Sequence, residues 1–479
     1  MLVRPLLSSP NTPENPLKKY LIAAAATVLA ASAFAQTEPF GTFKRPFAAD
    51  SPWNIRPIGP VFGAYVLPAG IYKPSVGSGP WSTAAFLAKE DDKPMVVALY
   101  PSSGGDTDPD AREKPTSVTI PRWPAATTPA TESDGHAEIV DPYTGRVHSF
   151  WQLKLVDGQW RAALHAWSPL DGRGWGDPSH YYQGARATGV STIGGLIRIH
   201  EVEDGKPLYE HALAMSLPKE GLSRAPTYVY PATSADAYAE RDNSGQIPEG
   251  ALMMLPPDYK MTYNNPLLQK VVDTLKVYGA RVVDRNVGTP FSIYVENGAP
   301  FRLWTNNPGA DNAMYNEMDN MRKALRQVIS ANSYVDGNGQ PTTADKPGNF
   351  NILSMRGPWQ AQAGSGTPAP FNTFTQSIEF PSKPTVVEQS NSNGSGVSGG
   401  VTWAAPVPGA TYKVTAIGSG GARVRVQLWK GGSVVASTGY LSNGQSANVV
   451  WPSSGGWTTI WAISAPNQAG SIRATMIKQ

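Results

Sequence analysis

Short segments of alternating apolar and polar residues, separated by glycine-containing turns, limit the fold of this chain more than any other sequence feature. They are densest near the C-terminus, at Thr411–Ile417, Ala422–Lys430, Ser433–Tyr440, Ala447–Trp451, Trp457–Ser464 and Ser471–Ile477. Alternation with period two turns one side of a strand to the core and the other to solvent. We therefore predict a small antiparallel β-sandwich for residues 401–479.

Strand-like segments also dominate the chain before residue 300. They are Glu138–Val140, Val147–Val156, Gln159–Trp167, Gly195–Val202, Leu208–Leu217, Thr227–Pro231 and Phe291–Glu296. The 47 glycines and 44 prolines favour short strands joined by turns. Apolar spacing typical of a helix occurs only at Asn265–Tyr278 and Asp311–Ser330. The predicted fold is mainly β: an antiparallel β-sandwich or jelly-roll-like N-terminal domain with two accessory helices, then the C-terminal sandwich.

Residues 389–400 are rich in serine, asparagine and glycine, a composition that cannot bury a core and predicts a linker. This places the main domain at 36–388. Beyond Glu388 the chain has no acidic residue and six basic ones, Lys413, Arg423, Arg425, Lys430, Arg473 and Lys478. The C-terminal domain is therefore expected to be a separate, positively charged unit.

The N-terminus has the three regions of a secretory signal. Lys18 and Lys19 precede the apolar run 20–30, and Ala33-Phe34-Ala35 forms a small-residue cleavage site. The run is shorter than the roughly 20 residues that span a membrane, so we predict a signal peptide at 1–35, a secreted or periplasmic protein and no membrane association after cleavage. The absence of cysteine excludes disulfides, thiol catalysis and cysteine metal sites.

All six histidines lie between residues 134 and 217, which points to a functional site in this stretch. If 195–202 and 208–217 form a hairpin, Glu201 lies opposite Tyr209 and diagonal to His211, at about 7–8 Å. Asp134 and His136 share a face of another strand. The candidate catalytic residues are Asp134, His136, Glu201 and His211. The alternative is a polar core in which these side chains form hydrogen bonds with one another. On the same pattern Arg198 and His200 point to solvent or to an open groove.

Several motifs together resemble a largely uncharacterised family of secreted bacterial β-rich proteins. They are Asp-x-His before a Val-Asp strand (134–141), Gly-Gly-Leu-Ile-Arg-x-x-Glu (194–201), His-Ala-Leu (211–213), Tyr-x-Tyr-Pro-Ala (228–232), Pro-x-Gly (248–250) and Tyr-Gly-Ala-x-Val-x-Asp (278–284). The resemblance spans Pro52–Gly357 and implies importance for Asp134, His136, Arg198, Glu201 and His211, without naming a reaction. Relatives often have Asp-Arg-His where this chain has Asp134-Gly135-His136, and Asp-Glu where it has His200-Glu201. An arginine that binds substrate at the first place would be missing here.

The leading functional hypothesis is a secreted polysaccharide-cleaving enzyme that needs no cofactor. In a glycoside hydrolase, Glu201 and Asp134 would be the acid and the base or nucleophile, oriented by His211 and His136. In a polysaccharide lyase, a histidine or Tyr209 would abstract a proton while Arg198 neutralises the substrate carboxylate. No serine-hydrolase elbow, phosphate loop or zinc-protease motif is present.

The C-terminal domain is expected to bind the same polymer. Arg423, Arg425, Gln427 and Trp429 alternate with apolar residues and therefore share one strand face, suited to an anionic polymer such as a uronate glycan. The alternative for this face is an ordinary solvated edge. The expected partner is an extracellular polysaccharide, the first to test being an anionic one, and not a nucleic acid.

Two further functions remain open from the sequence. One is a non-catalytic, lectin-like or envelope-binding protein. The other is a metal-dependent enzyme that holds a divalent ion on His136, Glu201 and His211. The sequence does not specify the linkage cleaved or the oligomeric state.

Overall fold

The computed structural model describes residues 38–100, 107–110, 115–177, 180–344, 349–391 and 401–479. The predicted signal peptide and residues 392–400 of the predicted linker lie outside these ranges. Among the helices in the described ranges, none is both long and apolar enough to cross a membrane.

The prediction of a mainly β protein is confirmed, with 34% of residues in strands and 10% in helices. The largest sheet has eight strands, with β16 (Pro341–Thr342) paired to β15 beside the main path. In order along that path they are β1 (Arg56–Phe62), β15 (Arg326–Val335), β12 (Leu252–Met254), β13 (Ala280–Asn286), β11 (Leu213–Pro218), β14 (Ser292–Tyr294) and β2 (Ser75–Gly77). Unlike the antiparallel sheet expected, β11 pairs in parallel with β13 and β14 with β2. The carboxyl ends of β11 and β13 therefore meet at one edge of the sheet.

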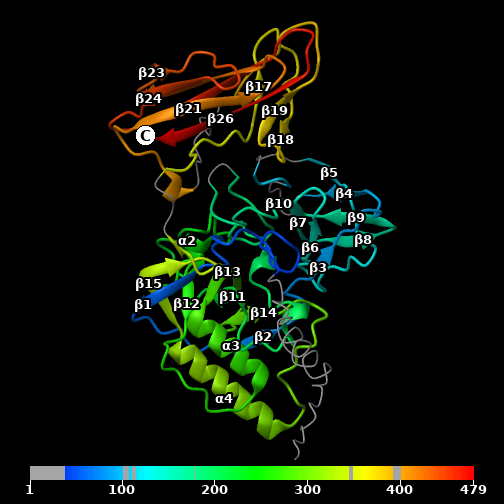
Figure 1. The fold of residues 1–479 in the computed structure, drawn as a ribbon, viewed down its shortest axis with the longest axis vertical. Helices are drawn as coiled ribbons and strands as arrows, with labels where there is room; N and C mark the ends of the chain where they lie inside the picture. The colour runs from blue at the N-terminus through cyan, green and yellow to red at the C-terminus, as the bar shows by residue number, and fades with distance from the viewer. Residues whose placement is uncertain (1–37, 101–106, 111–114, 178–179, 345–348, 392–400) are drawn as a thin grey trace, which may run out of the picture. The chain divides into compact units, whose positions relative to one another are not determined.

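Two helices cover one face of this sheet (Figure 1). Helix α3 spans Pro266–Val277 and begins after Asn265, whose side chain accepts a hydrogen bond from the Leu268 amide. Helix α4 spans Pro308–Ala324, with Asn307 at its N-cap. The prediction that this helix continues to Ser330 was wrong, because the chain from residue 326 onwards forms β15, which bonds to β1 and β12. A four-residue helix, α2 (Ala239–Asp242), lies between β11 and β12.

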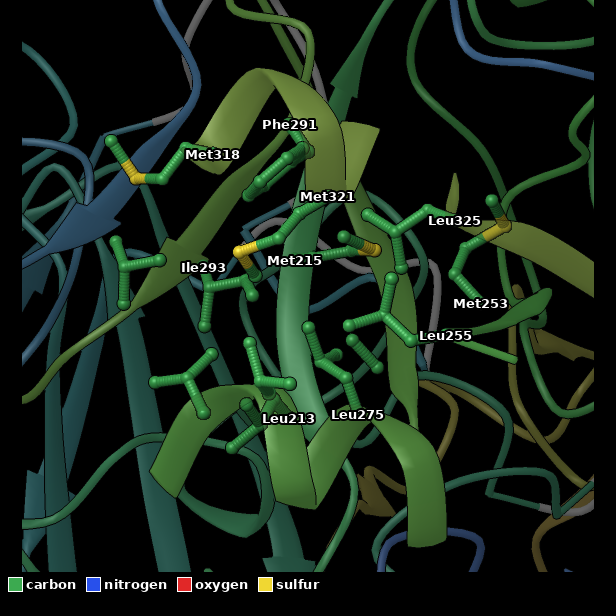
Figure 2. Packing of buried hydrophobic residues seen from close by; sticks show 14 of the residues in the cluster. Leu213, Met215, Met253, Leu255, Leu275, Phe291, Ile293, Met318, Met321 and Leu325 are labelled. Atoms are coloured by element: carbon green, nitrogen blue, oxygen red, sulfur yellow. The ribbon is translucent and has the colours of Figure 1, made fainter. Parts of the chain in front are cut away.

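Methionine and leucine side chains fill the space between this sheet and the helices. Figure 2 shows Met215 and Ile293 from the sheet facing Met318 and Met321 from α4, with Leu275 of α3 in the same cluster. All five are fully buried. The methionines of α4 are therefore core residues, and they pack α4 against the sheet. One edge of that sheet carries the polar residues described below.

Two four-stranded sheets precede β11 in the chain. One has the order β10 (Leu164–Pro169), β7 (Arg146–Trp151), β6 (Ala137–Asp141) and β3 (Ala85–Leu87). The other has the order β5 (Ser117–Ile120), β4 (Met95–Leu99), β9 (Gln159–Ala162) and β8 (Lys154–Val156). The strands predicted between residues 138 and 167 are present, with each of the two longer segments divided into a pair.

The predicted hairpin of 195–202 with 208–217 was wrong. Residues 192–194 and 199–201 form the 3-10 turns η2 (Thr192–Gly194) and η3 (Ile199–Glu201) instead. Of the second segment only 213–218 is a strand, and it bonds to β13 and β14. The alternation of apolar and polar residues in 195–202 therefore does not mark a strand, because this segment is irregular. Thr227–Pro231 forms no strand either, apart from a single bridge from Tyr228 to Glu249.

The C-terminal sandwich is confirmed and has two five-stranded, fully antiparallel sheets. The first has the order β17 (Gln360–Ala361), β20 (Glu388–Asn391), β25 (Trp457–Ile463), β22 (Arg423–Lys430) and β23 (Ser433–Ser437). The second has the order β18 (Phe371–Asn372), β19 (Ser377–Phe380), β26 (Gly470–Lys478), β21 (Thr411–Gly418) and β24 (Ser446–Val450).

The predicted domain boundary at residue 389 falls inside the sandwich. Strands β17 to β19 precede the predicted linker and β20 overlaps its first residues, yet β19 bonds to β26 and β20 bonds to β25, both of which follow it. The linker therefore connects strands of one domain, and 36–388 is not a separate structural unit.

Candidate functional site

A buried arginine at the carboxyl edge of β11 and β13 organises a cluster of polar residues. Arg186 donates from Nε to Thr192 Oγ1, from Nη1 to Asp284 Oδ2 and from Nη2 to the carbonyl oxygen of Trp81, each at 3.0 Å. Its guanidinium lies over the ring of Tyr294, 4.6 Å from the centroid. With all three nitrogens bonded, this charge is held in a fixed position.

Asp284, near the end of β13, belongs to a group of interacting carboxyls. Asp236 accepts a hydrogen bond from the Arg285 amide at 2.9 Å and also interacts with the Asp284 side chain. Burial, and next the charge of Asp284, raise the pKa of Asp236 to about 7. Burial and Asp236 likewise raise the pKa of Glu249, whose carboxylate accepts from the Asp236 amide. The group therefore retains protons near neutral pH, and its titration belongs to the carboxyls together.

Asp134 and His136 also belong to this cluster. The sequence predicted that they share one face of a strand, but in the structure they lie next to each other just before a strand. They precede β6, and His136 Nε2 lies 4.0 Å from Asp134 Oδ2. Burial and the charge of Arg186 hold the pKa of His136 well below 6.5, so its ring is neutral. The side chains of Asp134, Asp236 and Asp284 are 29%, 21% and 17% exposed, so all three are partly exposed. We call Asp134, His136, Arg186, Asp236 and Asp284 the Arg186 cluster.

A second buried acid fixes the turn behind Arg186. Glu138 of β6 accepts hydrogen bonds from the amides of Thr192 and Ile193 at 2.7 and 2.8 Å, and from the hydroxyl of Ser191 at 3.0 Å. Burial raises its pKa, and these donors oppose that shift. Because Thr192 also receives Arg186, Glu138 positions the arginine and does not itself reach solvent.

The predicted contact between Glu201 and His211 is present although the hairpin is not. His211 Nε2 lies 3.2 Å from Glu201 Oε2, and its Nδ1 donates to the Ala212 carbonyl at 2.9 Å. Burial works against both charges, but the imidazolium holds the pKa of Glu201 at about 2 and the carboxylate raises that of His211. The Arg198 amide also donates to Glu201, at 2.9 Å. Glu201 and His211 therefore form an ion pair. Because the pKa of Glu201 is low, its carboxyl is ionised at neutral pH and cannot act as a proton donor.

Two of the predicted substrate-binding residues lie inside the protein. Arg198 is 2% exposed and donates to Glu296 at 2.8 Å and to the Phe43 carbonyl at 2.9 Å, which corrects the prediction that it faces an open groove. Tyr209 is 1% exposed, under the ammonium of Lys270, which lies 4.7 Å from its ring centroid.

The four predicted catalytic residues fall into two pairs. Across the described part of the chain, no hydrogen bond or ion pair connects Asp134 or His136 with Glu201 or His211. Within the same residues, no group of three or more histidine, aspartate or glutamate side chains has the geometry to hold a metal ion. Both nitrogens of His211 are already engaged. The residues proposed for a divalent metal, His136, Glu201 and His211, therefore do not fit one.

Sequence reasoning missed Arg186, Asp236 and Asp284. Asp284 closes the motif at 278–284, so its position in a run of family-like residues was a usable signal. Arg186 and Asp236 lie in irregular segments without a periodic pattern, and only long-range contacts bring them to the edge of the sheet.

The residues predicted to form the binding face of the C-terminal sandwich are neighbours on one strand. Arg423, Arg425 and Trp429 lie on one side of β22, while Val424 and Val426 on the other side are fully buried. The three predicted residues therefore share an outward face of the first sheet.

Comparison with known proteins gives no assignment. No family model matches the chain, and no curated protein matches it significantly. A solved structure, described as accessory secretory protein 1, 2 and 3 of Streptococcus pneumoniae, aligns with 29% of this chain and 99% of that one. The identity is 6% and the TM-score 0.18, so the alignment carries no argument about fold or function.

Proposed function

We propose that the protein is a secreted polysaccharide-cleaving enzyme whose reaction takes place at the Arg186 cluster. The observation that carries this proposal is a set of three partly exposed acidic side chains: Asp284 is bound to the fixed Arg186, and Asp134 and Asp236 both interact with Asp284. Cleavage of a glycosidic bond needs one carboxyl that donates a proton and a second that is ionised. Asp236 is the proton donor, and Asp134 is the base or nucleophile.

Hydrolysis is better supported than elimination. A lyase needs a cation that reaches the uronate carboxylate of its substrate and a base that removes the adjacent proton. Arg186 and Arg198 are both buried and have carboxylate partners, and Tyr209 and His211 are enclosed. The acidic side chains of the Arg186 cluster are 17% to 29% exposed, against 11% for the side chain of His211. Asp236, and not Glu201 as the sequence suggested, is therefore the candidate proton donor.

An exposed tryptophan whose backbone contacts the cluster favours a sugar substrate. The backbone oxygen of Trp81 binds Arg186, while the residue is 54% exposed. Flat aromatic rings stack on the apolar faces of sugars, and a ring at this place would hold a sugar unit next to the carboxyls.

The test is incubation of the protein with neutral and uronate polysaccharides, with separate measurement of reducing ends and of ultraviolet-absorbing unsaturated products. We expect reducing ends without unsaturation, with a rate that falls above about pH 7 as Asp236 loses its proton. Asp236→Asn should lower the rate by roughly 10²-fold or more. Glu240→Gln, an exposed acid four residues away, is the matched control and should retain full activity.

Equal rates in Asp236→Asn and wild type would contradict the assignment of the acid. A non-catalytic glycan-binding protein is the second candidate function, favoured by the aromatic and basic face of the C-terminal sandwich. It predicts retained polysaccharide binding with neither kind of product, and that result would replace the enzyme hypothesis.

A further inference from the structure

The outward face of the first C-terminal sheet carries more aromatic and basic side chains than the sequence pattern of β22 alone revealed. Cross-strand pairing places Trp457 opposite Trp429 and Trp461 opposite Arg425. Directly opposed residues of an antiparallel pair share a face. Trp457 and Trp461 of β25 therefore extend the face already defined by Arg423, Arg425 and Trp429. We call these five residues and Tyr440 the tryptophan–arginine face.

One end of this face is cationic. The Arg425 guanidinium lies between two aromatic rings, 4.8 Å from the centroid of Tyr440 and 4.7 Å from that of Trp461. Arg423 lies over the same Tyr440 ring at 5.4 Å. Such a stacked arginine has a fixed plane, which suits it to bind a carboxylate.

The acid next to this end is already engaged. Glu388 of β20 accepts a hydrogen bond from the Tyr440 hydroxyl. Two guanidinium groups therefore face one carboxylate, and the surplus charge at this end is positive.

The other end of the face is a flat aromatic surface. Trp429 and Trp457 stack with their ring centroids 5.0 Å apart and their planes inclined by 9°, and Trp457 is 40% exposed. Trp429 lies four positions after Arg425 along β22, which is about 13 Å at 3.3 Å per residue. Gln427 and Thr459, which are neutral, lie between the two ends. A ligand that contacts both ends must be extended, with an anionic group at some distance from a stacking group.

We propose that the tryptophan–arginine face binds an extended acidic polysaccharide, with a sugar ring stacked on Trp457 and a uronate carboxylate paired with Arg425. This inference deepens the proposed function by naming the ligand class of the sandwich, and it rests on that function for the choice of a glycan. Single-stranded nucleic acid also combines stacking with negative charge. It is disfavoured because a phosphate backbone calls for cations along the whole face, whereas here they lie at one end.

The experiment measures binding of the full chain to polygalacturonate by calorimetry, with fully methyl-esterified polygalacturonate as the uncharged polymer of the same backbone. Trp457→Ala and Arg425→Gln should each weaken binding to polygalacturonate about tenfold or more, equivalent to about 1.4 kcal/mol. Arg473→Gln removes one positive charge from the other sheet and should leave the affinity unchanged. Near-ultraviolet circular dichroism and the thermal unfolding midpoint verify that each variant is folded.

Unchanged affinity in folded Trp457→Ala and Arg425→Gln would overturn the proposal. Equal binding of the methyl ester would overturn its charge component, and tighter binding of an oligothymidylate would favour a nucleic acid instead. Asp236→Asn, the variant that tests cleavage, should bind polygalacturonate like the wild type. Loss of cleavage and loss of binding are therefore distinguishable.

Discussion

Glu201 and His211 meet in the structure by a route that strand parity did not describe. The predicted contact assumed two paired strands, whereas Glu201 ends the 3-10 turn η3 and His211 precedes β11. An unpaired charge in the protein interior is costly. Two largely buried groups of opposite charge that are close in sequence are therefore expected to pair, whatever the backbone between them does. The residue types predicted the contact, and the assumed hairpin added nothing to it.

The stability contributed by this pair depends on pH. The folded pKa of His211 is raised above 6.5, so its contribution is complete below that value and is lost as pH rises through the folded pKa. The folded pKa of Glu201 is about 2 against 4.5, so its contribution is complete above 4.5 and is lost as pH falls toward 2. The pair therefore stabilises the fold most between pH 4.5 and 6.5.

His211→Gln should lower the free energy of unfolding by about 3 kcal/mol at pH 5.5, because it leaves Glu201 charged and without its cation. The deficit should become smaller by pH 9, where His211 of the wild type has lost its charge. Urea unfolding at both pH values measures it. Glu201→Gln/His211→Gln completes a double-mutant cycle, and a coupling energy near zero would contradict the ion pair.

At the scale of elements, strands within sequence-local sheets were predicted well and irregular segments were not. The six C-terminal strands and those between residues 138 and 167 have local partners and a solvent-facing side, which gives clear alternation. The prediction for 195–202 was wrong because this segment contacts residues that are distant in the sequence. Gly194 and Gly195 pack against Trp53, and β11 pairs in parallel with β13. Helix α4 ends early for the same kind of reason, since β15 bonds to β1.

The glycine at 195 is required by this packing. A Cβ atom there would lie 2.3 Å from Trp53 Cζ3 and 2.7 Å from the backbone nitrogen of Ala214. Trp53 is fully buried and stacked on Trp175, so it has no room to move. Gly195→Ala should lower the free energy of unfolding by roughly 2 kcal/mol or more.

The matched control is Gly77→Ala in β2, where an added Cβ would meet nothing within 4 Å. That substitution should change the free energy of unfolding by less than about 0.5 kcal/mol. Chemical denaturation of the two variants compares them directly. Equal effects at both positions would show that Trp53 is not the constraint.

At the scale of the whole molecule, composition alone misplaced the division of the chain. The run of serine, asparagine and glycine near residue 390 predicted a boundary between domains, but sequence composition does not show which strands on its two sides pair with each other. Strands β17 to β19 precede that run and β20 overlaps its start, and the remaining members of their two sheets follow it. The same limitation explains why the Arg186 cluster was only partly predicted, since Asp134, Arg186, Asp236 and Asp284 converge through the topology of the main domain.

The sandwich should therefore fold from residues 349–479 and not from residues 401–479. The shorter fragment lacks Phe371, Ile378, Phe380 and Val387, all buried in the same core. At about 1.5 to 3 kcal/mol for each buried side chain, the loss is about 6 to 12 kcal/mol, comparable with the whole stability of a small domain. It also leaves the edges of β25 and β26 without partners, which favours aggregation. We expect the longer fragment to be soluble with a cooperative thermal transition and the shorter one to aggregate or remain unfolded. A cooperative transition in the 401–479 fragment would place the boundary back at the linker.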